Sequence, residues 1–477
     1  MTNVPTNAAS AEVSAIDTQA RGPLLLLLGC GLAWLVASGV LSLITSIQLH
    51  SPGFMADCSL LTHGRAQALR ETEFIYGWVA NAGLGIALWV LGRLGGYPLR
   101  ALNWVVVGTV FWNLAVIAGC IGIATGDMTS FSLLQMPRYV QPLLVFAYAS
   151  VAISGVLAWS GRRNDGMYAA QWYAVAALFL LPWLLIAAQA VLLWMPVRGT
   201  VQAIAAGWFT QGMWSMWLAP LGLAGAYYVV PKLSGRMLPT YESAPLSFWT
   251  LMFVGAWTGG RHLIGGPVPA WVATMAVVAN GLLLFHYLVV GLNFRPIFGT
   301  AGSAAKFIRF GVAAYVLAGV LDLLVSFRGI SVRSQFTFLA TSLEQLGSYG
   351  GISMMFFGVI TFMLPRIAGT DWASPGFASG HRTLVTVGVV LSIVALAVGG
   401  WSQGGALLDQ NVALGEIFQH LRTPLLANTA AQAVLLVANL LLLVNFLRTV
   451  CACLCRGCDA PAQTGGASTS KLGAHAS

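Results

Sequence analysis

Charged residues are scarce in this sequence. Only 8% of its 477 residues are Asp, Glu, Lys or Arg, whereas soluble domains carry about 25%. Hydrophobic residues make up 58%. This composition excludes an ordinary soluble protein and predicts an all-α polytopic membrane protein embedded in the lipid bilayer. The net charge of +9 then concerns membrane topology and lipid headgroups, and nucleic acid is not an expected partner.

Motifs of soluble catalysis and of cofactor attachment are also missing. The sequence contains no GxxxxGK[ST] phosphate loop and no GxGxxG placed after a soluble strand. It contains no CxxCH motif, the attachment signal of c-type haem. A soluble nucleotide-binding domain is therefore excluded, and any cytochrome c-type electron donor would be a separate chain.

Apolar runs of membrane-spanning length dominate what is present. A spanning helix needs about 20 mostly apolar residues, and the lipid core leaves the backbone no hydrogen-bond partner except itself. Twelve runs predict about twelve transmembrane helices in one domain over residues 23–450. The runs are 23–48, 73–95, 101–125, 139–160, 167–195, 203–230, 246–265, 268–292, 307–327, 337–364, 382–402 and 424–450.

The basic residues predict how this domain is oriented. The two tails and every second loop carry fifteen of the 23 Lys and Arg, and the opposite side carries eight. Because cytoplasmic loops hold the excess of basic residues, both termini are predicted to be cytoplasmic. Residues 1–22 are polar and predict a disordered N-terminal tail. Residues 451–477 predict a Gly/Ser/Ala-rich C-terminal tail.

A cluster of cysteines opens the C-terminal tail, in the stretch "CACLCRGC". A metal site is one interpretation, although no second CxxC or His pair accompanies it. Juxtamembrane palmitoylation is another, and a reduced tail without a specific role is the third. The sequence leaves all three open for Cys451, Cys453, Cys455 and Cys458.

Few ionisable residues lie in the middle of the apolar runs, away from their ends, and such residues usually mark functional sites. They are Arg261 and His262 in the seventh run, His286 in the eighth, Asp322 in the ninth and Glu344 in the tenth. Arg261 stands out because a guanidinium stays charged in proteins. It therefore needs a carboxylate, carbonyl groups or water. The carboxylates inside nearby runs belong to Asp322 and Glu344.

Three separated blocks share a skeleton of glycines, aromatics and prolines with a known family. The first, at 61–94, contains "GRAQALRETEFIYGW". The second runs from "WFTQGMW" and "YYVVPK" (208–232) to "WTGGRHL" (248–263). The third, at 343–366, ends "FFGVITFMLP" before its arginine. These blocks resemble the catalytic subunit I of haem-copper oxidases, specifically the C-family, or cbb-type, cytochrome c oxidases. Twelve helices with both termini inside also match that family.

The resemblance breaks down at the metal ligands. In the family, six histidines hold a low-spin haem, a high-spin haem and a copper ion. The resemblance places the haem ligands on Arg70, Leu343 and Gln345, and the copper ligands on Gln211, Arg261 and His262. Only His262 is a histidine, and the tyrosine that the family couples to a copper ligand falls on Gly255. Haem iron needs His, Met, Cys or Tyr, and copper at such a site needs imidazoles.

The resemblance and this loss together predict the function. The chain is expected to be a subunit I-like protein of the bacterial cytoplasmic membrane that binds no haem or copper. It would act as a non-catalytic structural or regulatory partner of other respiratory-complex subunits. The alternative is a working terminal oxidase or nitric oxide reductase subunit with unusual ligands, which would hold haem b and copper and accept electrons from a cytochrome c. A transporter is a weaker third hypothesis.

A more specific expectation concerns the charge of Arg261. If this side chain points into the cavity that holds the metals in the family, its charge must be met there. We expect Arg261 to pair with Glu344, which lies between two former haem-ligand positions, or with Asp322 as the second choice. Either pair would stand in place of metal coordination.

Overall fold

The computed structural model describes residues 6–163 and 165–458, and within these residues it is helical without strands. The α-helices are α1 (Thr6–His50), α2 (His63–Thr72), α3 (Ala80–Gly95), α4 (Leu102–Thr125), α5 (Gln141–Ser160), α6 (Ala169–Ala188), α7 (Thr200–Gly212), α8 (Ala219–Ser234), α9 (Ala244–Val254), α10 (Ala270–Asn293), α11 (Ser303–Ser326), α12 (Arg328–Ser334), α13 (Phe338–Gln345), α14 (Met354–Ala368), α15 (Pro375–Leu408) and α16 (Leu414–Cys458).

Shorter helical segments of other types join several of these helices. Four are π-helical: η2 (Glu73–Val79), η3 (Gln189–Trp194), η4 (Met213–Leu218) and η8 (Leu346–Ser353). The others are 3-10 helices: η1 (Ser59–Leu61), η5 (Tyr241–Ser243), η6 (Gly255–Leu263) and η7 (Arg295–Gly299).

The predicted all-α membrane architecture is confirmed. In the described part of the chain, ten helices are long and apolar enough to cross a membrane, and they correspond to ten of the expected runs. The remaining runs, 203–230 and 246–265, correspond to other helical segments. The first is the helix formed by α7, η4 and α8, and the second is α9 followed by η6.

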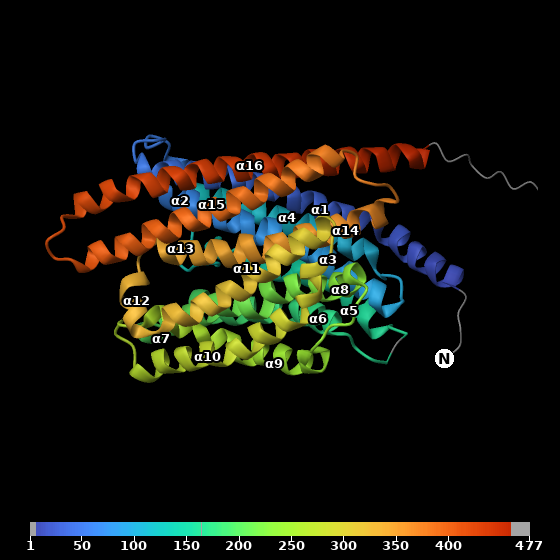
Figure 1. Cartoon of the computed structure of the whole chain (residues 1–477), viewed down its shortest axis with the longest axis horizontal. Coiled ribbons are helices and arrows are strands. Elements are labelled where there is room, and N and C mark those ends of the chain that lie inside the picture. The colour runs from blue at the N-terminus through green and yellow to red at the C-terminus, as the bar shows by residue number, and fades with distance from the viewer. Residues whose placement is uncertain (1–5, 164, 459–477) are drawn as a thin grey trace, which may run out of the picture.

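The long helices run nearly parallel to one another (Figure 1). Helices α15 and α16 pack side by side along one edge of the bundle, and α9 and α10 lie at the opposite edge. The first described turn of α1 and the last of α16 lie at the same end. This arrangement agrees with two tails on one side of a membrane.

The N-terminal stretch differs from its prediction. A disordered tail over 1–22 is wrong from Thr6 onward, because α1 begins at that residue. The physical reason is a fixed partner for a polar side chain in this stretch. Asp17 forms an ion pair with Arg93 of α3 and accepts a hydrogen bond from the indole nitrogen of Trp89 at 3.0 Å.

The C-terminal boundary also differs from its prediction, because α16 continues through the cysteine cluster to Cys458. Cys451 and Cys455 are exposed, Cys453 is buried, and all three are free thiols. The side chain of Cys458 and the predicted tail beyond it lie outside the described residues. The metal and palmitoylation interpretations of the cluster stay predictions.

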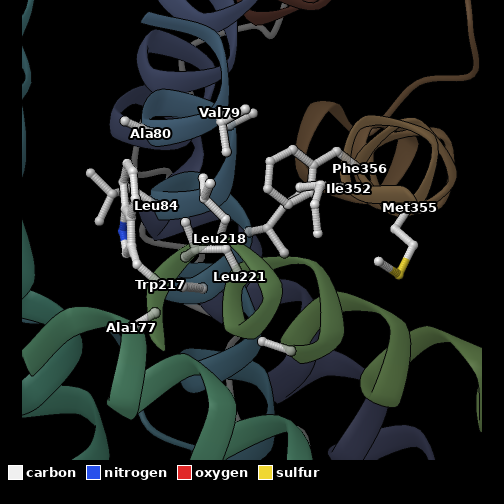
Figure 2. Packing of buried hydrophobic residues seen from close by; sticks show 14 of the residues in the cluster. Val79, Ala80, Leu84, Ala177, Trp217, Leu218, Leu221, Ile352, Met355 and Phe356 are labelled. Atoms are coloured by element: carbon white, nitrogen blue, oxygen red, sulfur yellow. The ribbon is translucent and has the colours of Figure 1, made fainter. Parts of the chain in front are cut away.

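A dense core lies where the π-helical segments meet. Val79, Ala80 and Leu84 of η2 and α3 face Trp217, Leu218 and Leu221 of η4 and α8, and Ile352, Met355 and Phe356 of η8 and α14 complete the layer (Figure 2). Small residues let the helices approach closely: a Cβ placed on Gly83 would lie 2.6 Å from the Leu221 side chain. This core positions η2, η4 and η8 rigidly.

Candidate functional site

The predicted site residues lie at places where the helices change type. Three of the π-helical segments begin shortly after a predicted ligand position: η2 follows Arg70, η4 follows Gln211 and η8 follows Gln345. The 3-10 segment η6 itself contains Arg261 and His262. Irregular turns inside long helices occur frequently at functional sites. Four helices thus converge on one region, each with a local distortion.

Arg261 is held by an ion pair with Asp322 of α11. The guanidinium Nη2 lies 2.5 Å from the Asp322 Oδ1, and the two side chains are 18% and 20% exposed. The backbone carbonyl of Arg261 accepts a hydrogen bond from Gln335 Nε2 at 3.3 Å. The partner is therefore Asp322, the second of the two expected residues.

Glu344, the first expected partner, is not the residue that binds Arg261. It lies on the same cavity wall, but within the described residues no hydrogen bond or ion pair involves its carboxylate. The reason is the position of Glu344 on helix α13. Glu344 borders two cavities at once, whereas Asp322 borders only the cavity that contains Arg261.

Cavity A is the space around this ion pair and has a volume of about 130 Å³. It is lined by α7, η4, α8, α9, η6, α10, α11, α13 and η8. It brings together four of the six predicted ligand positions and both carboxylates, which are Gln211, Arg261, His262, Leu343, Asp322 and Glu344.

Gln211 and a neighbour show that cavity A has a polar lining of its own. Gln211 donates from Nε2 to the Thr258 hydroxyl at 3.0 Å, and Thr258 donates to the Gly255 carbonyl at 2.7 Å. The buried Nδ2 of Asn280 has no partner in the described structure and borders the same space. Polar groups therefore form part of the lining of cavity A.

Cavity B, of about 90 Å³, contains the other two predicted positions, Arg70 and Gln345. Glu344 and Trp214 border both cavities, so they form the wall between them. The resemblance placed haem ligands on Arg70, Leu343 and Gln345, and the structure brings the first and the last of these into one cavity. Trp214 was not predicted. Its position three residues after Gln211, on one helix face, is the signal that could have found it.

The residues present do not fit a haem or a copper ion. The side chains at the six positions include two guanidiniums, two amides and an alkyl group, and none of these is a haem or copper donor of the usual kind. Arg261 is already paired, and its cation would repel a metal. Over residues 6–163 and 165–458, no three His, Cys, Asp or Glu side chains lie close enough to hold a metal ion together.

The other buried histidines serve packing and hydrogen bonding. His286 bonds Ser247 through Nδ1 at 2.9 Å and the Tyr315 hydroxyl through Nε2 at 2.9 Å. His381 bonds the Ala438 carbonyl through Nδ1 at 2.9 Å. Neither borders cavity A or B. In the described chain, no ring contact joins two histidines.

The backbone of η6 packs closely against the backbone of α7, and a substitution can test the importance of this contact. A Cβ on Gly259 would lie 2.2 Å from the Gly207 carbonyl oxygen, which belongs to α7. We expect Gly259→Ala to force η6 away from α7 and to lower the free energy of unfolding by about 1–3 kcal/mol. Chemical unfolding in mixed micelles measures this change. Gly281→Ala is the control, because nothing lies within 4 Å of that Cβ, and an equal loss in both variants would contradict the expectation.

Comparison with known proteins places this site in a family. The fold defines an all-helical, multi-pass membrane protein. The family described as Cytochrome C and Quinol oxidase polypeptide I matches residues 23–454. The chain belongs to this family of haem-copper oxidase subunits.

Individual relatives are distant in sequence, but their similarity extends over most of the chain. The chain is 22% identical to "Cytochrome c oxidase subunit 1" of Rhodobacter capsulatus over 401 residues, which cover 78% of this chain and 73% of that protein. It is 24% identical to "Cytochrome c oxidase subunit 1 homolog" of Azorhizobium caulinodans over 410 residues, covering 78% of this chain and 70% of the relative.

A solved structure shows the same fold. A heme-copper terminal oxidase determined by cryo-electron microscopy as a dimer superposes with a TM-score of 0.68 at 12% identity. The superposition covers 92% of this chain and 84% of that one. At this identity the likeness concerns the fold alone.

Proposed function

We propose that this chain is a non-catalytic member of the family, from its cbb-type branch, in which a protein-internal polar network stands where relatives hold haem and copper. It would act as a structural or regulatory partner of other subunits in a respiratory complex. We further propose that it resides in the bacterial cytoplasmic membrane with both termini in the cytoplasm.

The ion pair between Arg261 and Asp322 carries this proposal. A guanidinium at a copper-ligand position supplies a fixed positive charge, and a carboxylate at 2.5 Å neutralises it. The pair satisfies the local charge without any metal. The amide of Gln211 is likewise engaged with Thr258, so two of the three copper-ligand positions have protein partners.

The alternative is a working terminal oxidase or nitric oxide reductase subunit, and the names of the relatives favour it. Both bacterial relatives described above are named for cytochrome c oxidase. Such a subunit would need haem b, copper and a separate cytochrome c-type donor. It would also need donors other than the side chains that border cavities A and B.

The two proposals differ in whether the protein should show the optical spectrum of a haem. We expect the purified full-length chain to show no stoichiometric b-type haem signal in a reduced-minus-oxidised spectrum, and no stoichiometric copper by elemental analysis. The reason is that iron and copper would have to displace a paired cation and bind amides. A haem-containing oxidase subunit purified identically is the control for loss during preparation. One haem b per chain would overturn the non-catalytic proposal.

A further inference from the structure

Cavity B holds two charged side chains without a partner in the part of the chain that the structure describes. The Arg70 guanidinium makes no hydrogen bond or ion pair among the described residues, and its buried Nε has no acceptor. The Glu344 carboxylate likewise has no donor. The carboxylate of Glu71 also borders cavity B, but it accepts hydrogen bonds from Ser132 and Gln135. One free cation and one free anion thus face the same small space.

Both free groups lie inside the membrane-embedded bundle, where unpaired charges are costly. Glu344 is deep in the bundle but keeps much of its surface free, because it borders open space on two sides. The two side chains do not form an ion pair with each other, although they border one cavity. Something with both a negative and a positive end would satisfy both at once.

We propose that cavity B binds a small zwitterion of the amino-acid class. Its carboxylate would meet the Arg70 guanidinium, and its ammonium group would meet the Glu344 carboxylate. This proposal rests on the proposed function in one respect, namely that no haem occupies the cavity. The zwitterion would be the ligand through which the chain performs the proposed regulatory role.

The lining and the size of cavity B agree with such a ligand. Neutral polar groups from four helices surround the two charges: Ser38 and Ser42 of α1, Thr210 of α7, Gln345 of α13 and Gln432 of α16. The volume of about 90 Å³ is several times the roughly 10–15 Å³ that a single water needs by the same measure. It suits a compact molecule such as glycine or β-alanine.

Single charges fit the cavity less well. A small anion would satisfy Arg70 but would lie beside the carboxylates of Glu71 and Glu344. A small cation would satisfy Glu344 but would give the buried Nε of Arg70 no hydrogen-bond acceptor. A zwitterion leaves the net charge of the cavity unchanged and adds two charge-assisted hydrogen-bonding groups.

Two further cavities lie between this site and the edge of the bundle. Cavity C, of about 290 Å³, adjoins cavity A at Arg261 and His262, and it is bordered by Phe336, whose side chain is 92% exposed. Cavity A in turn adjoins cavity B at Glu344 and Trp214. The three cavities therefore adjoin one another between Phe336 and Glu344, with the Arg261–Asp322 pair beside the middle one.

Binding can be measured with the full-length chain in lipid nanodiscs. Glycine and β-alanine are titrated while Trp fluorescence is recorded, because Trp214 borders the proposed ligand, and radiolabelled glycine gives the stoichiometry. We expect saturable binding of one zwitterion per chain. Acetate and methylammonium, which each carry one of the two charges, are expected to bind at least about ten-fold more weakly.

Two variants that each remove one charge separate the two ends of the ligand. Glu344→Gln and Arg70→Gln are each expected to weaken glycine binding by about ten-fold or more. Glu344→Gln should leave acetate binding intact, and Arg70→Gln should leave methylammonium binding intact. Glu416→Gln and Arg422→Gln are the matched controls on the exposed surface of α16 and should bind glycine as the unchanged chain does. Thermal unfolding without ligand shows whether each variant is folded.

The results have distinct meanings. No saturable zwitterion binding at millimolar concentrations would overturn the proposal, as would acetate or methylammonium binding as tightly as glycine. Unchanged glycine affinity in folded Glu344→Gln and Arg70→Gln would overturn it as well. The haem spectrum separates this failure from that of the proposed function. A haem-free chain that ignores glycine refutes only the ligand, whereas a haem-loaded chain refutes the non-catalytic role.

Discussion

Replacing Asp322 by Asn is expected to destabilise the protein by about 3–5 kcal/mol, because it leaves the Arg261 cation without its carboxylate inside the bundle. The pair is short, at 2.5 Å, and each side chain is only about one-fifth exposed. That residual exposure faces the cavities, so water can relieve part of the penalty, and the lower end of the range is expected. Chemical unfolding in mixed micelles, followed by Trp fluorescence, measures the loss.

Two further variants separate a broken ion pair from a general weakness of the region. Arg261→Gln combined with Asp322→Asn removes both charges and is expected to recover most of the stability, as often happens when a whole buried pair is replaced. Glu344→Gln removes a carboxylate that has no hydrogen-bond or ion-pair partner among the described residues and should cost little. If Glu344→Gln were as destabilising as Asp322→Asn, the assignment of Asp322 as the partner would be wrong.

The choice between these two carboxylates shows what the sequence leaves undetermined. It identifies both as the only candidates, but it does not give the rotation of each helix. The lining of cavity A contains that information: Tyr315, Ala318, Gly319 and Asp322 recur at the three- and four-residue spacing of a single helix face. A helical projection of α11 would have placed Asp322 on the same face as these small and aromatic residues.

Glu344, in contrast, does not belong to a single cavity-facing side of its helix. Residues 340, 343, 344 and 347 border cavity A, and residues 341, 344, 345 and 348 border cavity B. These are two neighbouring faces of one helix, and Glu344 belongs to both. The two haem-ligand positions of this helix, Leu343 and Gln345, therefore fall into different cavities on either side of it. Helical periodicity predicts this separation, whereas the identity of the contents depends on side chains from other helices.

The helical bundle was predictable because the bilayer restricts which backbone structures can cross it. Scarce charge and long apolar runs require helices, and the motif skeleton points to the family that matches residues 23–454. The polar ends of the chain were not predictable by the same logic. A stretch with few apolar residues is disordered by composition alone, unless individual polar groups find partners elsewhere. For residues 14–22 those partners lie some seventy to more than three hundred positions away in sequence.

Asp17 is the residue whose replacement tests this point most strongly. Its carboxylate pairs with Arg93, accepts from Trp89 Nε1 at 3.0 Å and from Arg93 Nε at 2.8 Å, and is only 5% exposed. Asp17→Asn removes the charge and leaves Arg93, 11% exposed, without a counter-ion. We expect a loss of about 3–5 kcal/mol in the free energy of unfolding, at the upper end because this pair is less exposed than that of Arg261 and Asp322.

The loss should be accompanied by a local signature. Beside Asp17, α1 is held through Gln19 Nε2, which donates to the Leu99 carbonyl at 3.2 Å, and Arg21 Nε, which donates to the Ile367 carbonyl at 2.7 Å. These contacts are weaker than a buried ion pair, so hydrogen exchange over residues 14–22 should accelerate in Asp17→Asn more than elsewhere in the bundle. Asp57→Asn is the matched control, since Asp57 lies exposed in the loop after α1. Unchanged exchange over residues 14–22 would show that α1 is held at this end by its apolar contacts and not by the charge of Asp17.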